Sequence, residues 1–167
     1  MTTETPRPSR LWREMTDTQK LAASQAFWAD EGSFAEQAEV MGLIARQLKF
    51  RPKSVVALPV EKKVRLTLRM GTMSDAVAGR LLVSYHLATQ RLMMSAFLDA
   101  LGIKHGEGLI DEDETPAPTP EQLNAAATTI VGTFPADDVR LYFQTLLLQD
   151  PETWGPLAAH VPERSAS

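Results

Sequence analysis

The sequence has 167 residues, of which 44% are hydrophobic and 23% are charged, and its formal net charge is −4. This length and balance are typical of one globular domain and exclude a globally disordered chain. The absence of cysteine excludes disulfide bonds, thiolate metal sites and cysteine nucleophiles, and it fits a reducing compartment. Because residues 1–10 also lack the apolar stretch of a secretory signal, we expect a cytoplasmic protein.

The chain begins with residues 1–13, which we expect to be a flexible arm because they contain two prolines and no hydrophobic periodicity. Only Leu11 and Trp12 in this arm are suited to docking on the rest of the protein. From 14 to 160 we predict a single all-α domain, followed by a disordered tail at 161–167. The first helix is predicted to begin at Thr16, which forms a capping box with Gln19, and to end near Ala29.

A second capping box, formed by Ser33 and Glu36, predicts the start of the next helix. Apolar residues then recur every three to four positions, as on one face of an amphipathic helix. We expect this face to pack on the core, and its members are Phe34, Ala38, Met41, Ala45 and Leu48.

The segment after Phe50 is basic and irregular, and a further helix is predicted to begin at Pro59 and to end at Gly71. Residues 62–70 also fit a strand, because their apolar and polar side chains alternate. We favour the helix, since a lone strand would have no pairing partner in an otherwise helical chain.

The longest helical pattern runs from Ser74 to Leu101 and predicts one long, buried central helix with the other helices wrapped around it. Its polar residues form one narrow stripe, which we expect to be its only open side: Arg80, Ser84, Arg91, Ser95 and Asp99. The charges in this stripe interrupt the apolar run, so we predict no membrane span.

The last third of the chain begins with a glycine-rich loop at 102–108 and an acidic, proline-rich linker at 111–120. Helices are then predicted to begin at Thr119, which forms a capping box with Gln122, at Pro135 and at Asp150. The whole chain is therefore predicted to be a compact bundle of about six helices.

A weak internal repeat relates residues 59–72 to residues 120–133. Shifted by 61 positions, Pro59, Thr67, Gly71 and Thr72 coincide with Pro120, Thr128, Gly132 and Thr133. This spacing indicates either a duplicated helix-turn-helix unit or helix-capping chemistry that the two segments share.

Residues that could carry catalysis or hold a metal are scattered. The sequence contains no zinc-protease, phosphate-loop, nucleophile-elbow or calcium-loop motif, so we expect no enzyme, cofactor or metal. One interpretation places an apolar pocket around His86, Met93 and Phe97, because methionine adapts to irregular ligands and the intrinsic pKa of histidine is near neutrality. The alternative is that all three are ordinary core residues.

Charge is strongly segregated along the chain. Residues 46–91 carry ten Lys and Arg against two Asp and Glu, whereas residues 92–167 carry three against twelve. Most of the cations belong to one stretch, called the basic segment below: Arg46, Lys49, Arg51, Lys53, Lys62, Lys63, Arg65 and Arg69. Such a run indicates an anionic partner, a solvated face or the complement of an acidic surface.

Three classes of function follow. We favour a non-enzymatic helical interaction or regulatory module that binds a protein partner or self-associates, because catalytic constellations are missing while segregated charge is plentiful. The second is a nucleic-acid or other polyanion binder that uses residues 46–69. The third is a binder of an apolar small molecule, or an enzyme acting on one, with a pocket beside His86 and Met93.

Overall fold

The computed structural model describes residues 7–70, 73–103, 105–106, 109–110 and 117–163. These residues form two compact units, one of residues 7–88 and one that begins at Thr89. Whether these two units form the single domain predicted over 14–160 is not decided by their description, so the single domain stays a prediction.

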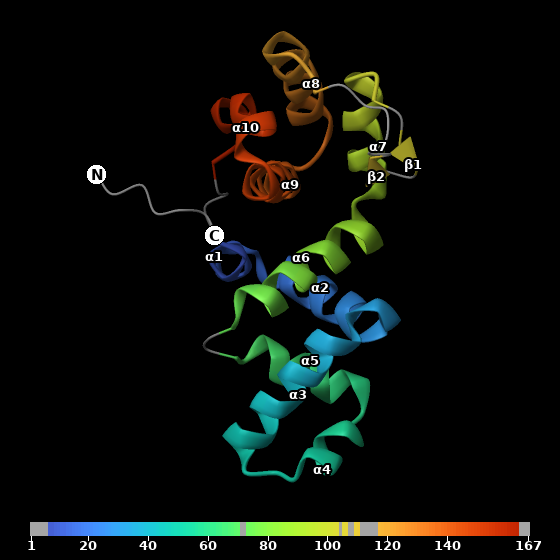
Figure 1. Cartoon of the computed structure of the whole chain (residues 1–167), viewed down its shortest axis with the longest axis vertical. Coiled ribbons are helices and arrows are strands. Elements are labelled where there is room, and N and C mark those ends of the chain that lie inside the picture. The colour runs from blue at the N-terminus through green and yellow to red at the C-terminus, as the bar shows by residue number, and fades with distance from the viewer. Residues whose placement is uncertain (1–6, 71–72, 104, 107–108, 111–116, 164–167) are drawn as a thin grey trace, which may run out of the picture. The chain divides into compact units, whose positions relative to one another are not determined.

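The first unit is entirely helical (Figure 1), in agreement with the predicted all-α class. Its α-helices are α1 (Pro8–Glu14), α2 (Asp17–Ala29), α3 (Phe34–Leu48), α4 (Pro52–Val56), α5 (Val60–Leu68) and α6 (Asp75–Thr89), and the short 3₁₀ helix η1 (Glu31–Ser33) joins α2 to α3. Helix α5 packs on α2, and α4 packs on α3.

The second unit is also helical apart from one pair of very short antiparallel strands. Its elements are α7 (Arg91–Ala100), β1 (His105–Gly106), β2 (Leu109–Ile110), α8 (Pro120–Thr133), α9 (Ala136–Gln149), α10 (Pro151–Trp154) and the 3₁₀ helix η2 (Gly155–His160). Both predicted threonine capping boxes, at Thr16 and Thr119, are present. The greater part of the acidic linker, 111–116, and the end of the tail, 164–167, lie outside the described residues.

The number of helices is wrong in the prediction: the described residues contain ten α-helices instead of about six. Two of the additional helices are short and begin with a proline, at Pro8 and Pro52. Proline in the first turn has the φ of a helix and loses no backbone hydrogen bond there, so these prolines start helices where we expected an arm and a connector. The short helix predicted to begin at Asp150 is present as α10. In α1, which replaces part of that arm, Leu11 and Trp12 are buried.

The predicted long central helix is not continuous. It forms α6 and α7, separated at Gln90, whose φ of −120° and ψ of 18° are not helical. The break coincides with the boundary between the two compact units. No proline or glycine marks it in the sequence, so packing of each half within its own unit overrides the local helix preference.

The internal duplication is not supported either. Helix α5 has 9 residues and begins after Pro59 without a side-chain cap, whereas α8 has 14 residues, includes Gly132 and begins with a capping box. The similarity between the two segments is therefore limited to a few residues of the kind that begin or end helices.

The junction between α2 and α3 is held by the carboxylate of Asp30. Its oxygens accept hydrogen bonds from the backbone N–H of Gly32 (2.9 Å), from Ser33 Oγ (3.0 Å) and from Arg80 Nη2 of α6 (2.8 Å). Arg80 Nε also donates to Ser33 Oγ (2.8 Å). The predicted capping box at Ser33 is therefore wrong, because its hydroxyl joins this network and makes no cap hydrogen bond.

These contacts also place Arg80 and Ser84 differently from the open polar stripe that we expected on the central helix. Arg80 turns toward the α2–α3 junction, and Ser84 is buried. A Cβ on Gly32 would lie 2.7 Å from Arg80 Nη2, so with any other residue at this position the guanidinium would have to shift.

Helix α5 is attached to α2 by a buried hydrogen bond, in which Trp28 Nε1 donates to Thr67 Oγ1 (3.0 Å). Above the Trp28 ring lies Lys63 Nζ, 5.5 Å from the ring centroid. Residues 62–70 are thus helical up to Leu68, as we favoured over a strand.

Helix α3 turns only part of its predicted face to the core. Ala45 of that face is buried, together with Val40 and Ile44, which were not predicted, whereas Phe34 is 73% exposed. One cause lies at the start of the helix, where Gln37 Nε2 donates to the carbonyl oxygens of Phe27 (2.8 Å) and Asp30 (3.1 Å). Because Gln37 closes the end of α2, the apolar positions on the other side of α3 remain open.

The second unit has an aromatic core centred on Phe97 of α7. The Phe97 ring lies 5.6 Å from Tyr142, 5.5 Å from Phe143 and 6.0 Å from Trp154, measured between ring centroids. Helices α7, α9 and α10 therefore share one core, since aromatic pairs at these distances attract each other beyond their area burial.

Replacing Thr67 by valine tests the attachment of α5. Thr67→Val keeps the shape of the side chain but leaves the buried Trp28 N–H without its acceptor, so we expect a loss of about 1–2 kcal/mol in the free energy of unfolding. Thr128→Val is the matched control, because the Thr128 hydroxyl binds a backbone carbonyl on the exposed side of α8. Urea unfolding should show a change of less than about 0.5 kcal/mol there, and equal losses in both variants would contradict the role of Thr67.

The Asp30 network predicts a specific pH dependence. The hydrogen bond from the Gly32 N–H holds the pKa of Asp30 below its ordinary value of 3.8, against the effect of desolvation, and the other two donors lower it further. A lowered folded-state pKa stabilises the protein above pH 3.8, and this stability is lost as the pH falls through the folded-state value. We therefore expect Asp30→Asn to be less stable than the wild type at about pH 7 and the difference to shrink by about pH 3. A difference that stays constant over this range in chemical unfolding would contradict this account.

Candidate functional site

All eight residues of the basic segment lie in the first unit, on three consecutive helices and their connections. Arg46 and Lys49 stand at the end of α3, and Arg51 and Lys53 begin α4, which packs on α3. On α5, the exposed cations Lys62, Arg65 and Arg69 recur at helical spacing, away from the buried Val64 and Thr67. The structure thus places the predicted cations in two groups, one at the junction of α3 and α4 and one on the outer face of α5.

Seven of the eight cations are exposed, and none of the eight forms an ion pair with a carboxylate of the described residues. The exception in exposure is Lys63, which is half-buried above the Trp28 ring and so contributes to the attachment of α5. A cationic surface that has no carboxylate partner among the described residues is available to an anionic partner.

Lys49 adopts an unusual backbone conformation. Its φ of 56° and ψ of 35° lie in the left-handed region, and it ends α3 at the position where glycine is the most common residue. Any side chain with a Cβ is strained there relative to glycine. The conformation directs the chain from α3 into the connection that carries Arg51.

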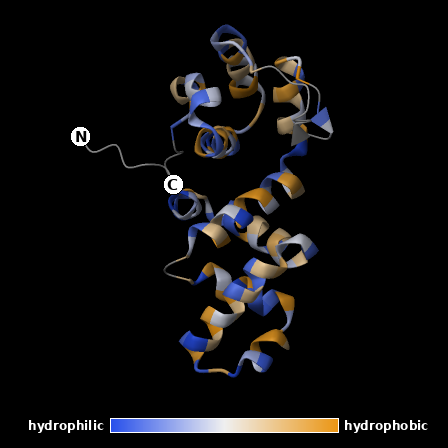
Figure 2. Cartoon of the chain, viewed as in Figure 1, coloured by the Kyte–Doolittle hydropathy of each residue, from blue (hydrophilic) through white to orange (hydrophobic). Residues whose placement is uncertain are grey.

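Large apolar side chains are exposed among these cations. Leu48, Phe50, Val56 and Val60 retain between 41% and 58% of their accessible surface. Figure 2 shows hydrophobic and hydrophilic positions alternating along this part of the chain, from the end of α3 through α4. The surface is therefore mixed in character: positive charge with apolar side chains between the charges.

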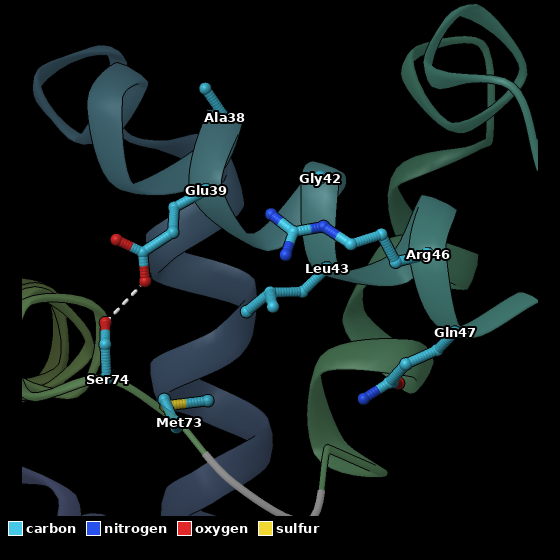
Figure 3. A pocket seen from close by; sticks show the side chains of 8 residues that line it. All are labelled: Ala38, Glu39, Gly42, Leu43, Arg46, Gln47, Met73 and Ser74. Atoms are coloured by element: carbon cyan, nitrogen blue, oxygen red, sulfur yellow. Dashed lines mark hydrogen bonds between the residues drawn. The ribbon is translucent and has the colours of Figure 1, made fainter.

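A groove with a volume of about 500 Å³ runs along the exposed side of α3. Six of its lining residues come from two rows of this helix, Ala38, Gly42 and Arg46 in one row and Glu39, Leu43 and Gln47 in the other. Met73 and Ser74, just before α6, complete it (Figure 3), and the Ser74 hydroxyl donates a hydrogen bond to Glu39 Oε2.

Of the residues that line this groove, only Arg46 was predicted as a site residue. The one local signal of the groove is Gly42, since glycine in the interior of a helix costs stability and often has a packing or functional reason. A Cβ on Gly42 would meet no atom within 4 Å, so the space above this residue is open.

A second cavity, of about 280 Å³, lies where α1, α2 and α5 meet. Trp12, Leu68 and Met70 supply its apolar wall, and Arg13 and Lys20 supply positive charge. The Lys20 ammonium lies 5.9 Å from the centroid of the Trp12 ring, so this cation already has an aromatic partner within the chain.

The residues of the predicted apolar pocket are divided between the two units. His86 is on α6 of the first unit, and Met93 and Phe97 are on α7 of the second. Met93 and Phe97 are both fully buried, and Phe97 contacts three aromatic rings. His86 is 4% exposed and lies edge-on to the ring of Tyr85. All three side chains are buried, and the apolar pocket around them stays a prediction.

The other two histidines each contact one side chain of the second unit. His105 Nε2 lies 2.7 Å from Asp99 Oδ1, and His160 Nε2 lies 2.8 Å from Asn124 Oδ1. Among the described residues, no three His, Asp or Glu side chains are grouped so that they could hold a metal ion. Within the same part of the chain, every helix is too short or too polar to cross a bilayer.

Comparison with known proteins returns no match: no family model, no curated protein and no solved structure is significantly similar to this chain.

Replacing Lys49 by glycine tests whether its left-handed backbone conformation is strained. Because glycine adopts the left-handed conformation without strain, we expect the variant to be more stable than the wild type by up to about 1 kcal/mol. Lys53→Gly is the matched control, since Lys53 lies within α4 and the same change there should cost up to about 1 kcal/mol. Chemical unfolding measures both, and a destabilised Lys49→Gly would contradict the strain that we assign to Lys49.

Proposed function

We propose that this protein is a non-enzymatic interaction module, which binds an acidic segment of a protein partner through the basic segment. The observation that carries the proposal is the mixed surface at α3 to α5, where cations without ion pairs among the described residues alternate with exposed apolar side chains.

Charge supports an anionic partner. The middle of the chain carries ten Lys and Arg against two Asp and Glu, although the whole chain is acidic. Complementary charge accelerates association and excludes partners of the wrong sign. Among the basic residues, Lys49 takes the position where glycine would be less strained, which is the kind of local cost found at functional sites.

The apolar side chains favour a protein over a nucleic acid. Phosphate contacts need only cations, and single-stranded bases stack on aromatic rings, of which this surface offers Phe50 alone. The exposed side chains of Leu48, Val56 and Val60 are aliphatic, so they offer no ring on which a base could stack. A partner segment in which carboxylates flank leucine-like side chains would satisfy both kinds of group, as amphipathic helices do in apolar grooves.

A labelled peptide of about 16 residues, with leucine at helical spacing among glutamates, is the probe that tests this proposal. We expect salt-sensitive binding in fluorescence anisotropy and a loss of about tenfold or more in affinity for the double variant Lys53→Glu/Arg65→Glu. Lys49→Gly should also bind more weakly while being more stable. Val56→Ser/Val60→Ser should weaken binding even in high salt, because it removes apolar contacts and no charge.

Arg13→Glu, on α1 outside the basic segment, is the matched control and should bind the peptide as the wild type does. Peptide binding that is absent, or equal in the wild type and the charge-reversed variant, would overturn the proposal. If the protein bound duplex or single-stranded DNA more tightly than the peptide, and Val56→Ser/Val60→Ser did not weaken this binding, the partner would be a polyanion and the proposal would be overturned. Vesicles of anionic lipid that compete with the peptide would point to a membrane surface and overturn it as well.

A further inference from the structure

The groove on α3 has a property that the basic segment does not share: its chemistry is complementary to itself. Its six α3 residues form three pairs, each placed symmetrically about the midpoint between Gly42 and Leu43. The pairs are Gly42 with Leu43, Glu39 with Arg46, and Ala38 with Gln47. When two identical helices pack antiparallel about a two-fold axis at this midpoint, each residue lies opposite its pair on the other helix.

The charged pair supports such a contact. Glu39 and Arg46 are two helical turns apart, about 10 Å along the axis, and form no ion pair with each other. Figure 3 shows the Arg46 side chain extending across the groove past Gly42, and the Glu39 carboxylate directed toward Ser74. The Ser74 hydroxyl holds Glu39 at the edge of the groove through Oε2, and Oε1 has no partner among the described residues. In the antiparallel arrangement, each carboxylate faces the guanidinium of the other copy.

The sizes of the central side chains match in the same way. The space above Gly42 is open, and Leu43 beside it is the largest apolar side chain that α3 contributes to the groove. In the symmetric contact, Leu43 of each copy enters the space above Gly42 of the other. The two rows of residues spaced by four are the ridges that pack into grooves between helices.

We propose that the groove on α3 binds the α3 helix of a second copy of this chain, forming an antiparallel two-fold dimer with two Glu39–Arg46 ion pairs. This inference goes beyond the proposed function and does not rest on it. One helix pair is a small interface, so we expect dissociation in the micromolar range.

Native mass spectrometry and light scattering at about 100 µM test the dimer. We expect the wild type to show twice the chain mass of 18.4 kDa. Glu39→Arg and Arg46→Glu should each be monomeric, because each places like charges opposite one another in both halves of the interface. Mixed together, with one of them ¹⁵N-labelled, these two variants should form one-to-one heterodimers, because every charged pair is then complementary again. The double variant Glu39→Arg/Arg46→Glu should recover the homodimer.

Gly42→Leu fills the space that receives Leu43 and should also be monomeric. It should remain folded, because the Cβ meets no neighbour and leucine is a better helix former than glycine. Gly132→Leu is the matched control: Gly132 lies in α8 of the second unit, its Cβ would also meet nothing within 4 Å, and its dimer should equal that of the wild type. Circular dichroism confirms folding in each variant.

Three results would overturn the dimer: a monomeric wild type at this concentration, a dimer that persists in both single charge variants, or a mixture of those variants that stays monomeric. A monomeric wild type whose binding of the glutamate–leucine peptide is lost in Gly42→Leu would assign the groove to the protein partner instead. Glu39→Arg and Gly42→Leu lie outside the basic segment. Peptide binding that survives in them, beside a failed dimer, therefore leaves the proposed function intact.

Discussion

The carboxylate of Asp30 is the constraint on which the arrangement of the first unit depends. It sits at the end of α2, and its two oxygens bind the backbone of η1, the Ser33 hydroxyl and the guanidinium of Arg80 from α6. Three helices are thereby connected at one point, α2 and α3 through the turn and α6 through the ion pair. A hydrogen-bonded ion pair that is partly shielded from water contributes more than its exposed counterpart, and this one also satisfies donors of the turn.

The orientation of α3 follows from this junction. Gln37, one turn into the helix, donates to two carbonyl oxygens at the end of α2, and Val40 and Ile44 then face the core. The opposite side of the helix, with Ala38, Gly42 and Arg46, is left open and forms the groove. At its far end, the left-handed Lys49 directs the chain into α4, so that the cations of the basic segment follow directly after the groove. The groove and the cations at the end of α3 thus owe their exposure to the polar contacts that hold α3, whereas the cations of α5 are turned outward by the attachment of Thr67 to Trp28.

The surfaces proposed for the acidic partner and for the dimer lie on neighbouring parts of this unit and differ in the kind of partner they complement. The basic segment has charge of one sign with apolar side chains between, which suits a partner unlike itself. The groove has one charge of each sign and one large residue beside one small one, which suits a copy of itself. Arg46 belongs to both, so a dimer that occupies this arginine would reduce the positive charge that the partner meets. Self-association would in that case weaken binding of the acidic partner, an antagonism that follows from shared use of one side chain.

Local sequence patterns by themselves determined the helical class, the capping boxes at Thr16 and Thr119, the helix at 60–68 and the location of the cations. These features depend on neighbours within a few residues, where spacing and capping chemistry act directly. Only the tertiary structure decided which face of α3 is buried. Gln37 donates to carbonyl oxygens at the end of α2, and Asp30 binds the guanidinium of Arg80, which is distant in the sequence. The tertiary structure also decided the break at Gln90, which has no proline or glycine to signal it, and the carboxylate to which the Arg80 guanidinium binds. A side chain of this length can reach solvent or a half-buried carboxylate equally well, and the position of the α2–α3 junction decides between them.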